Sequence, residues 1–107
     1  NARLLLMELG GTPASFRVHG NFPNPFNPRT SIRYDLPAPA RVSLRIRNIA
    51  GQEVDIPVAD TEMPAGRHVL DYDAGNLSSG VYFYTLTART YDPRQSGRYT
   101  GKFILLK

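Results

Sequence analysis

The segment RVSLRIR at residues 41–47 alternates apolar and polar side chains without interruption. One face of this segment consists of Val42, Leu44 and Ile46. The opposite face consists of Arg41, Ser43, Arg45 and Arg47. Successive side chains of a β-strand point to opposite sides, so a period of two predicts a strand that covers a core with one face. The other face is a cationic stripe that either is solvated or meets phosphate, lipopolysaccharide or an acidic partner.

The same alternation recurs on both sides of this segment. The core-facing positions that it predicts are Ile32, Tyr34, Leu36, Val54, Ile56, Val58, Leu70, Tyr72, Tyr82, Tyr84 and Leu86. Pro57 cannot donate a hydrogen bond to a neighbouring strand, so it marks an edge strand or a bulge. A last strand is predicted near residues 99–106, with alternating positions at Phe103, Ile104, Leu105 and Leu106. Because all four are apolar, this strand is expected to be covered on both faces.

Glycine and proline separate the predicted strands and leave no room for helices of ordinary length. Strand centres recur about every 10–15 residues, which gives about six or seven short strands. This spacing predicts an all-β fold, an immunoglobulin-like Greek-key β-sandwich of about seven antiparallel strands. A five-stranded oligonucleotide-binding barrel is the alternative, but it would leave one or two predicted strands over.

The composition fits one small domain and excludes several kinds of site. The chain has 107 residues, 41% of them hydrophobic, and no cysteine, which excludes disulfides, thiolate zinc sites and cysteine nucleophiles. Its longest apolar runs have four residues, whereas a membrane-spanning helix needs about 20, so no transmembrane segment is expected. The net charge of +4 combines an acidic middle, residues 54–88, with a basic end, residues 89–107. Such a division does not favour nucleic acid as a partner.

The first fifteen residues differ from the rest. Residues 1–9 suit a helix or an extra strand, and a linker-like GGTP follows at residues 10–13. We interpret residues 1–15 as a linker or the tail of an upstream domain, and residues 16–107 as the folded domain. The chain starts without a methionine or a signal peptide, so it is expected to be part of a longer protein.

No residue pattern in the chain indicates catalysis. A GxSxG nucleophile motif is absent, and His68 lies in phase with apolar strand residues, which favours a partly buried, hydrogen-bonded histidine over a general base. The run DYDAGN at residues 71–76 only partly resembles a calcium loop, so Asp71 and Asp73 are interpreted as outward-facing strand residues. We therefore expect no enzyme, no metal and no cofactor.

The run NFPNPFNP at residues 21–28, here called the strap, is the most unusual stretch of the chain. Proline fixes its own φ and keeps the preceding residue out of the helical region, so the strap is expected to be extended. One interpretation is a rigid crossing segment with Phe22 and Phe26 as anchors. The other is a peptide-like surface that a partner recognises.

The strap and the motifs that follow it resemble the C-terminal sorting domains of the type IX secretion system, subtype A. The resemblance covers roughly residues 16–107. It continues in order through TSIRYDLP at 30–37, NIAGQEV at 48–54, PAGRH at 64–68, LSSGVYFY at 77–84 and KFILLK at 102–107. The pattern is also similar to the immunoglobulin-like domain of flagellar hook-capping proteins, which implies the same fold.

This resemblance implies a non-catalytic secretion signal in a bacterial protein of the Bacteroidetes or allied lineages. An upstream cargo domain in the same chain would be led through the periplasm to the outer-membrane translocon and then to the cell surface or the medium. A sortase-like peptidase would commonly remove the signal. The positions that the family marks for partner recognition fall on Asn24, Pro25, Phe26, Gly80, Tyr82, Lys102 and Lys107.

The residues themselves suggest roles for some of these positions. Gly80 can supply the backbone freedom to leave a tight turn, and Tyr82 can start a strand as a buried aromatic residue. Lys102 and Lys107 place positive charge on a last strand that a partner could engage by edge pairing. Two other functions stay open. One is an accessory carbohydrate-binding module, using Tyr91 and Tyr99 in a long hairpin at residues 90–99, and the other is a structural immunoglobulin-like spacer.

Overall fold

The structure is a computed structural model in which residues 11–107 are described. The predicted helix or strand at residues 1–9 lies outside the described residues. The division of the chain at residue 15 stays a prediction, although the first strand does begin at Arg17.

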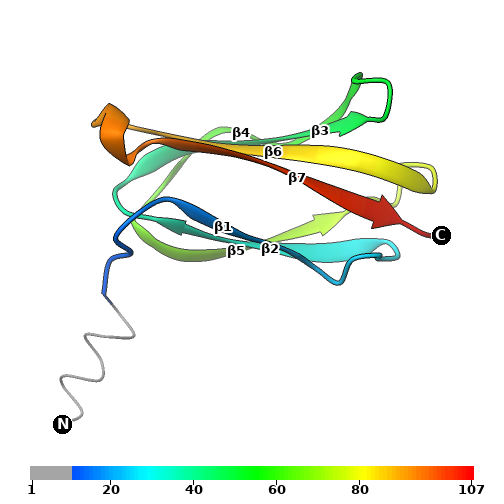
Figure 1. The fold of residues 1–107 in the computed structure, drawn as a ribbon, viewed down its shortest axis with the longest axis horizontal. Coiled ribbons are helices and arrows are strands. Elements are labelled where there is room, and N and C mark those ends of the chain that lie inside the picture. Colours follow the sequence, from blue (N-terminus) through cyan, green and yellow to red (C-terminus); the bar gives the residue numbers. More distant parts are fainter. Residues whose placement is uncertain (1–10) are drawn as a thin grey trace, which may run out of the picture.

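Seven antiparallel strands form two facing sheets, which confirms the predicted β-sandwich (Figure 1). The strands are β1 (Arg17–Phe22), β2 (Arg29–Leu36), β3 (Ala40–Asn48), β4 (Glu53–Met63), β5 (Gly66–Asp73), β6 (Gly80–Thr90) and β7 (Gly97–Leu105), with a 3₁₀ turn η1 at Pro93–Gln95. One sheet has the order β1-β2-β5 and the other the order β4-β3-β6-β7. Two separate sheets exclude the five-stranded barrel.

The predicted alternation builds most of the core. The inward positions of β2, β3 and β6 are buried, as expected, and contribute Ile32, Tyr34, Leu36, Val42, Leu44, Ile46, Tyr82, Tyr84 and Leu86. From β7, Phe103 lies at the centre of the aromatic contacts, with its ring centroid 5.8 Å from that of Tyr84. Burial raises the pKa of the Tyr34 and Tyr84 hydroxyl groups, because the ionised form would lose its hydration.

Strand β4 contains a bulge at Pro57, as that proline predicted. Between Leu44 and Ile46, β3 advances by two residues, while the paired residues of β4 run from Val58 to Asp55 and advance by three. The extra residue shifts the phase of β4 by one position. β4 is also an edge strand, where the missing proline N–H leaves no gap in the sheet.

This shift makes the prediction for Val54 and Ile56 wrong. Both were expected in the core, but they are 38% and 40% exposed. Asp55 points inward instead and accepts a hydrogen bond of 2.8 Å from the hydroxyl of Tyr72 on the opposite sheet. Burial raises the pKa of Tyr72, and the hydrogen bond to Asp55 raises it further. The bulge therefore replaces an apolar contact by a polar tie between the two sheets.

Strand β7 is covered on one face only, contrary to expectation. Phe103 and Leu105 are fully buried, but Leu106 is 56% exposed and Ile104 is half-buried. The reason is that the outer face of the four-stranded sheet carries no further layer (Figure 1). β7 is the edge strand of that sheet.

Two glycines on β7 let aromatic rings lie directly against the strand. A Cβ at Gly101 would lie 2.5 Å from Cζ of Tyr84, and one at Gly97 would lie 2.1 Å from Cδ2 of Phe16. Both distances are far below van der Waals contact, so larger residues would displace the rings. Because β7 begins at Gly97, the connection from β6 is shorter than the expected hairpin of residues 90–99 and spans residues 91–96.

Candidate functional site

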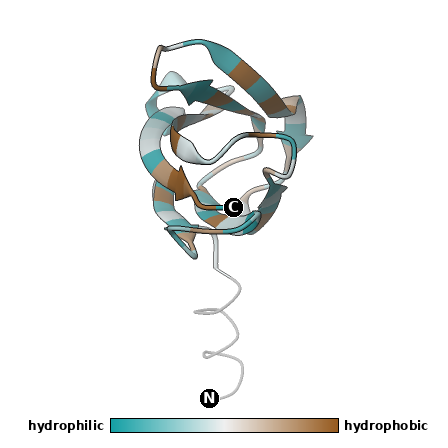
Figure 2. Cartoon of the chain, turned by 90° about the vertical axis from the view of Figure 1, so that its right-hand side faces the viewer, coloured by the Kyte–Doolittle hydropathy of each residue, from teal (hydrophilic) through white to brown (hydrophobic). Residues whose placement is uncertain are grey.

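The positions marked by the sequence resemblance lie together at the end of the sandwich where β7 finishes. They come from three segments far apart in the chain, residues 21–28, 75–82 and 102–107, which we call the strap–β7 end. Figure 2 looks at this end, with the C-terminus toward the viewer. The pairing of β6 with β7 joins two of these segments, since Gly80 pairs with Leu105 and Tyr82 pairs with Phe103.

The strap is hydrogen-bonded along the outer edge of β7. The backbone N–H of Phe26 donates to the carbonyl of Ile104, and the N–H of Leu106 donates to the carbonyl of Phe26, each at 3.0 Å. Phe26 and Leu105 thereby form a parallel bridge. The peptide bonds before Pro23, Pro25 and Pro28 are cis. The strap thus acts as a short additional strand beside the end of β7.

Asn24 extends this pairing with its side chain. Its Nδ2 donates to the carbonyl of Lys102 at 3.1 Å, and its Oδ1 accepts from the N–H of Ile104 at 2.9 Å. One side-chain amide therefore binds β7 as a backbone peptide group would. The exposed Pro25 separates Asn24 from Phe26. On the other side, Thr30 holds the strap, because its hydroxyl donates to the carbonyl of Pro23 at 2.8 Å.

Phe26 is the single aromatic anchor of the strap. Its side chain is 3% exposed and meets the ring of Phe103 edge-on, with centroids 4.8 Å apart. The expectation that Phe22 is a second anchor is wrong, because Phe22 is 82% exposed.

A bulge in β1 explains the exposure of Phe22. Between Val18 and Asn21, β1 advances by three residues while its partner β2 advances by two, from Tyr34 to Ile32. Ile32 faces the core, so its partner Asn21 is placed on the inner side. Phe22, the next residue, therefore points to solvent.

Tyr82 forms a hydrogen bond to the turn that precedes β6. Its ring is 7% exposed and lies 5.8 Å from that of Phe103. Its hydroxyl donates to the carbonyl of Ser78 at 2.6 Å. Tyr82 is thus a buried aromatic residue near the start of a strand, as the sequence predicted, and its polar tip closes the preceding turn.

Lys107 is folded back onto this same turn. Its Nζ donates to the carbonyls of Gly75 and Leu77 at 2.7 and 3.1 Å. Its backbone N–H donates to Oγ of Ser79 at 2.9 Å. The lysine therefore ties the residues after β7 to the segment between β5 and β6.

The strap already occupies the edge of β7 with which a partner was predicted to pair. The outward groups of this edge, from the carbonyl of Lys102 to the N–H of Leu106, already bond to the strap. A partner strand could bind there only by displacing the strap. The side chain of Lys102 is exposed, and it forms no ion pair within residues 11–107.

The candidates for chemistry lie elsewhere and do not converge. Asp71 and Asp73 are exposed, as predicted, and no group of three possible metal ligands occurs within residues 11–107. His68 is half-buried, stacks on Tyr34 with centroids 5.1 Å apart, and contacts the carbonyl of Pro64 at 2.8 Å. The structure therefore confirms the prediction of a partly buried, hydrogen-bonded histidine.

The tyrosine pair considered for carbohydrate binding does not form. Tyr91 is fully exposed in the loop after β6. Tyr99 instead packs against the core, with its ring 6.0 Å from that of Tyr84 and tilted by 45°. Tyr91 and Tyr99 therefore do not provide two coplanar exposed rings.

Among the described residues no helix is long and apolar enough to cross a membrane.

Sequence reasoning missed several residues that hold the strap–β7 end. Ser79 and Thr30 were not singled out, although Ser79 binds the distant Lys107 and Thr30 binds Pro23 within the strap. The signal that points to Thr30 is that it lies in phase with the apolar residues Ile32 and Tyr34, and in the structure it is 2% exposed. Nothing in the local sequence distinguishes Ser79 from other turn residues.

The chain was also compared with known proteins. A family model described as secretion system C-terminal sorting domain matches residues 21–104. No curated protein matches the chain. No solved structure matches it either.

Proposed function

Because this chain belongs to the family of secretion system C-terminal sorting domains, we propose that the strap–β7 end is the part that the type IX export machinery reads. The domain is a sorting signal for type IX secretion, and the family implies a cargo protein in the same chain. The destination of the exported protein is the cell surface or the medium. A non-catalytic role fits this family.

One observation supports the proposal more than any other. Asn24, Tyr82 and Lys107 come from three distant segments, and each is hydrogen-bonded within the strap–β7 end. A signal read as a linear peptide would not need contacts between residues 80 positions apart, such as that between Asn24 and Ile104. The recognised feature is therefore a folded surface that contains the last strand.

We propose the finer steps as the sequence resemblance implies them. The outer-membrane translocon binds the domain in the periplasm, and a sortase-like peptidase then removes it. The packed strap supports transit of the folded domain, because a domain that closes its own β7 edge can travel with the cargo without pairing with other strands.

The proposal is tested by export of a reporter. The whole chain, residues 1–107, is fused behind a periplasmic reporter protein in cells with and without a working type IX system. We expect the reporter at the surface or in the medium of competent cells only. The spacer function predicts retention in the periplasm of both strains, and that result would contradict the proposal.

A further inference from the structure

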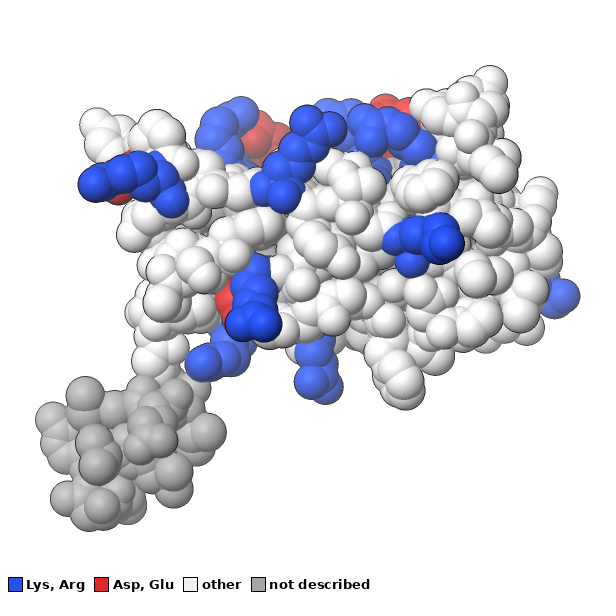
Figure 3. All heavy atoms as spheres, viewed as in Figure 1, with Lys and Arg blue, Asp and Glu red and all other residues white. Residues whose placement is uncertain are grey.

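Three neighbouring strands, β3, β6 and β7, contain no aspartate or glutamate at all. Their outward positions hold six basic residues, Arg41, Arg45, Arg47, Arg89, Arg98 and Lys102. We call this surface the basic face. Figure 3 shows basic side chains gathered along the four-stranded sheet, which is the upper layer in this view.

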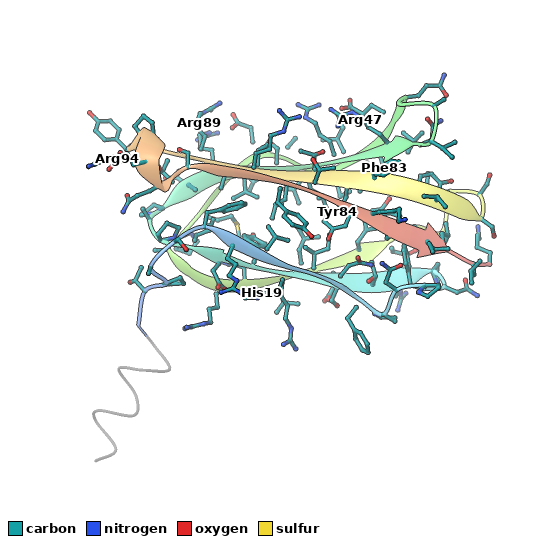
Figure 4. The ribbon with its side chains drawn as sticks, viewed as in Figure 1. His19, Arg47, Phe83, Tyr84, Arg89 and Arg94 are labelled. Atoms are coloured by element: carbon teal, nitrogen blue, oxygen red, sulfur yellow. The ribbon has the colours of Figure 1, made fainter. Side chains whose placement is uncertain are left out.

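The strand register places these cations side by side across the sheet. Arg41 lies opposite Arg89, and Phe83 lies between Arg47 on β3 and Lys102 on β7. In Figure 4, Arg47 and Phe83 lie on the outer side of the upper sheet, while Tyr84 points between the sheets. Phe83 is 36% exposed, so the basic face has an apolar residue within it.

The acidic residues of this sheet are confined to the edge strand β4. Asp60 forms ion pairs with Arg41 at 3.1 Å and with Arg89 at 3.3 Å, and Glu53 pairs with Arg45 at 2.9 Å. The positive charge of the face is thus partly neutralised near β4, and it is strongest on the β7 side.

On the β7 side the cations lack acidic neighbours. Arg98 and Lys102, both on β7, form no ion pair within residues 11–107. Arg47 on β3, whose register partner on β4 is Glu53, donates to the hydroxyl of Thr85 at 3.2 Å. Since β7 is an edge strand, Arg98 and Lys102 stand at the rim of the sheet. Lys102 belongs to the strap–β7 end, whereas Arg98 lies near the start of β7 at the other end of the sandwich.

We propose that the basic face, centred on Phe83, Arg98 and Lys102, docks on an acidic surface of a protein of the export machinery. This inference rests on the sorting function proposed above and adds the chemistry of the partner. Positive side chains around an exposed aromatic residue match the arginine and aromatic enrichment of protein interfaces. Complementary charge would steer the encounter and fix its orientation.

An anionic membrane fits this face less well than a protein. The carboxylates of Asp60 and Glu53 lie at the same sheet, 56% and 37% exposed, and a uniformly negative surface would repel them. A protein surface can place its own charges to match both the cationic and the neutralised side. The position of the carboxylates therefore favours an acidic protein patch opposite β6 and β7.

The opposite sheet supplies a matched control. Arg17 and Arg33 are exposed on the three-stranded sheet and, like Arg98 and Lys102, form no ion pair within residues 11–107. The variants R98E/K102E and R17E/R33E therefore change the net charge by the same amount on opposite faces.

The two variants are compared in the reporter fusion of the whole chain. We expect R98E/K102E to lower export about tenfold and R17E/R33E to leave it within about twofold of the unmodified fusion. The thermal unfolding midpoint of each purified variant shows whether the fold is kept. If R98E/K102E unfolds, the milder variant R98Q/K102Q takes its place. Unchanged export of a folded basic-face variant would overturn the inference.

An apolar pair tests the centre of the face independently of charge. F83A removes the exposed ring of the basic face, and V69A removes a side chain that is 62% exposed on the opposite sheet. Reduced export with F83A but not with V69A supports docking through the basic face. Equal export of both variants contradicts it.

Two binding measurements separate the other occupants. The purified chain is sedimented with phosphatidylglycerol vesicles, and its mass is measured by light scattering. If the chain is a monomer and does not sediment with the vesicles, the result supports a protein as the partner of the basic face. Vesicle binding that is lost in R98E/K102E would overturn the inference in favour of a membrane, and a dimer lost in that variant would overturn it in favour of a second copy. Loss of export by the unmodified fusion would contradict the sorting function itself.

Discussion

The two ends of the sandwich are closed in different ways. At the strap–β7 end, Asn24 bonds to β7 across 80 residues of chain, and Lys107 bonds to the turn before β6 across about 30. At the other end, residues 91–96 are held by hydrogen bonds between residues close together in the sequence. Ser96 Oγ accepts from the N–H of Thr90 at 2.9 Å, and the Asp92 carboxylate accepts from Arg94.

The two ends differ in how many strands must be folded before each end can form. The loop of residues 91–96 forms from its own hydrogen bonds and needs only the β6–β7 ladder beneath it. The strap–β7 end exists only if β1, β6 and β7 are all in place, because each contributes an adjoining segment. A surface built in this way is complete only when these strands have folded together.

The largest effect is expected at Phe26. Phe26→Ala removes a buried ring from the strap–β7 end and should lower the free energy of unfolding by about 3–5 kcal/mol. Phe22→Ala, in the same strap but on an exposed ring, should change it by less than about 0.5 kcal/mol. Denaturant unfolding of both variants measures the difference, and similar losses would show that Phe26 is not the anchor.

A smaller effect is expected at Asn24. Asn24→Ala removes two hydrogen bonds to β7 and should cost about 1–2 kcal/mol. Asn24→Asp retains an acceptor for the N–H of Ile104 but cannot donate to Lys102, so its loss should be intermediate. Hydrogen exchange at the Ile104 amide provides a local measurement. Equal protection in all three proteins would rule out the side-chain pairing.

Lys107 should contribute less, because its side chain is exposed. Lys107→Met keeps the length of the side chain but removes the donors to Gly75 and Leu77, and we expect a loss of about 0.5 kcal/mol. Faster exchange of the Leu77 amide, which donates to Ala74 in the same turn, would accompany it. A variant with unchanged exchange there would indicate that the lysine does not hold the turn.

The smallest effect is a pH dependence at the other end only. Hydrogen bonds from Arg94 lower the pKa of Asp92. A depressed pKa in the folded state means that these bonds stabilise the loop above the unfolded pKa and are lost as the pH falls through the folded pKa. The hydrogen bonds that the Asn24 and Lys107 side chains form at the strap–β7 end involve no carboxyl group. NMR titration should therefore shift the Arg94 amide at acidic pH and leave Ile104 in place, and a common shift would contradict the comparison.

The sequence was sufficient for strands β2, β3 and β6 but not for the edge strands β1 and β4 or for the ends. Alternation predicts which side of β2, β3 and β6 is buried, because it depends only on the side chains of one strand. It failed at Phe22 and at Ile56, since a bulge in each strand inverts the faces and a bulge is set by pairing with the next strand. The bonds of Asn24 could not be predicted, because they depend on how the strap crosses β7.

The site residues were found by a different route. The resemblance marked Asn24, Tyr82 and Lys107 separately, and only the structure shows that they meet at one end. Physical reasoning placed Lys102 at an open edge, whereas the strap occupies that edge. The basic face was visible in part as the arginine stripe of residues 41–47, but its extension over β6 and β7 required the strand order.

The most direct measurement is export of the Asn24→Ala fusion together with hydrogen exchange at Ile104 and Leu106. This variant leaves the sequence of residues 75–107 untouched and disturbs only the strap that covers it. If the folded strap–β7 end is the signal, export falls as the two amides lose protection. Export at the level of the unmodified chain, while both amides exchange freely, would show that the machinery reads a linear C-terminal sequence instead.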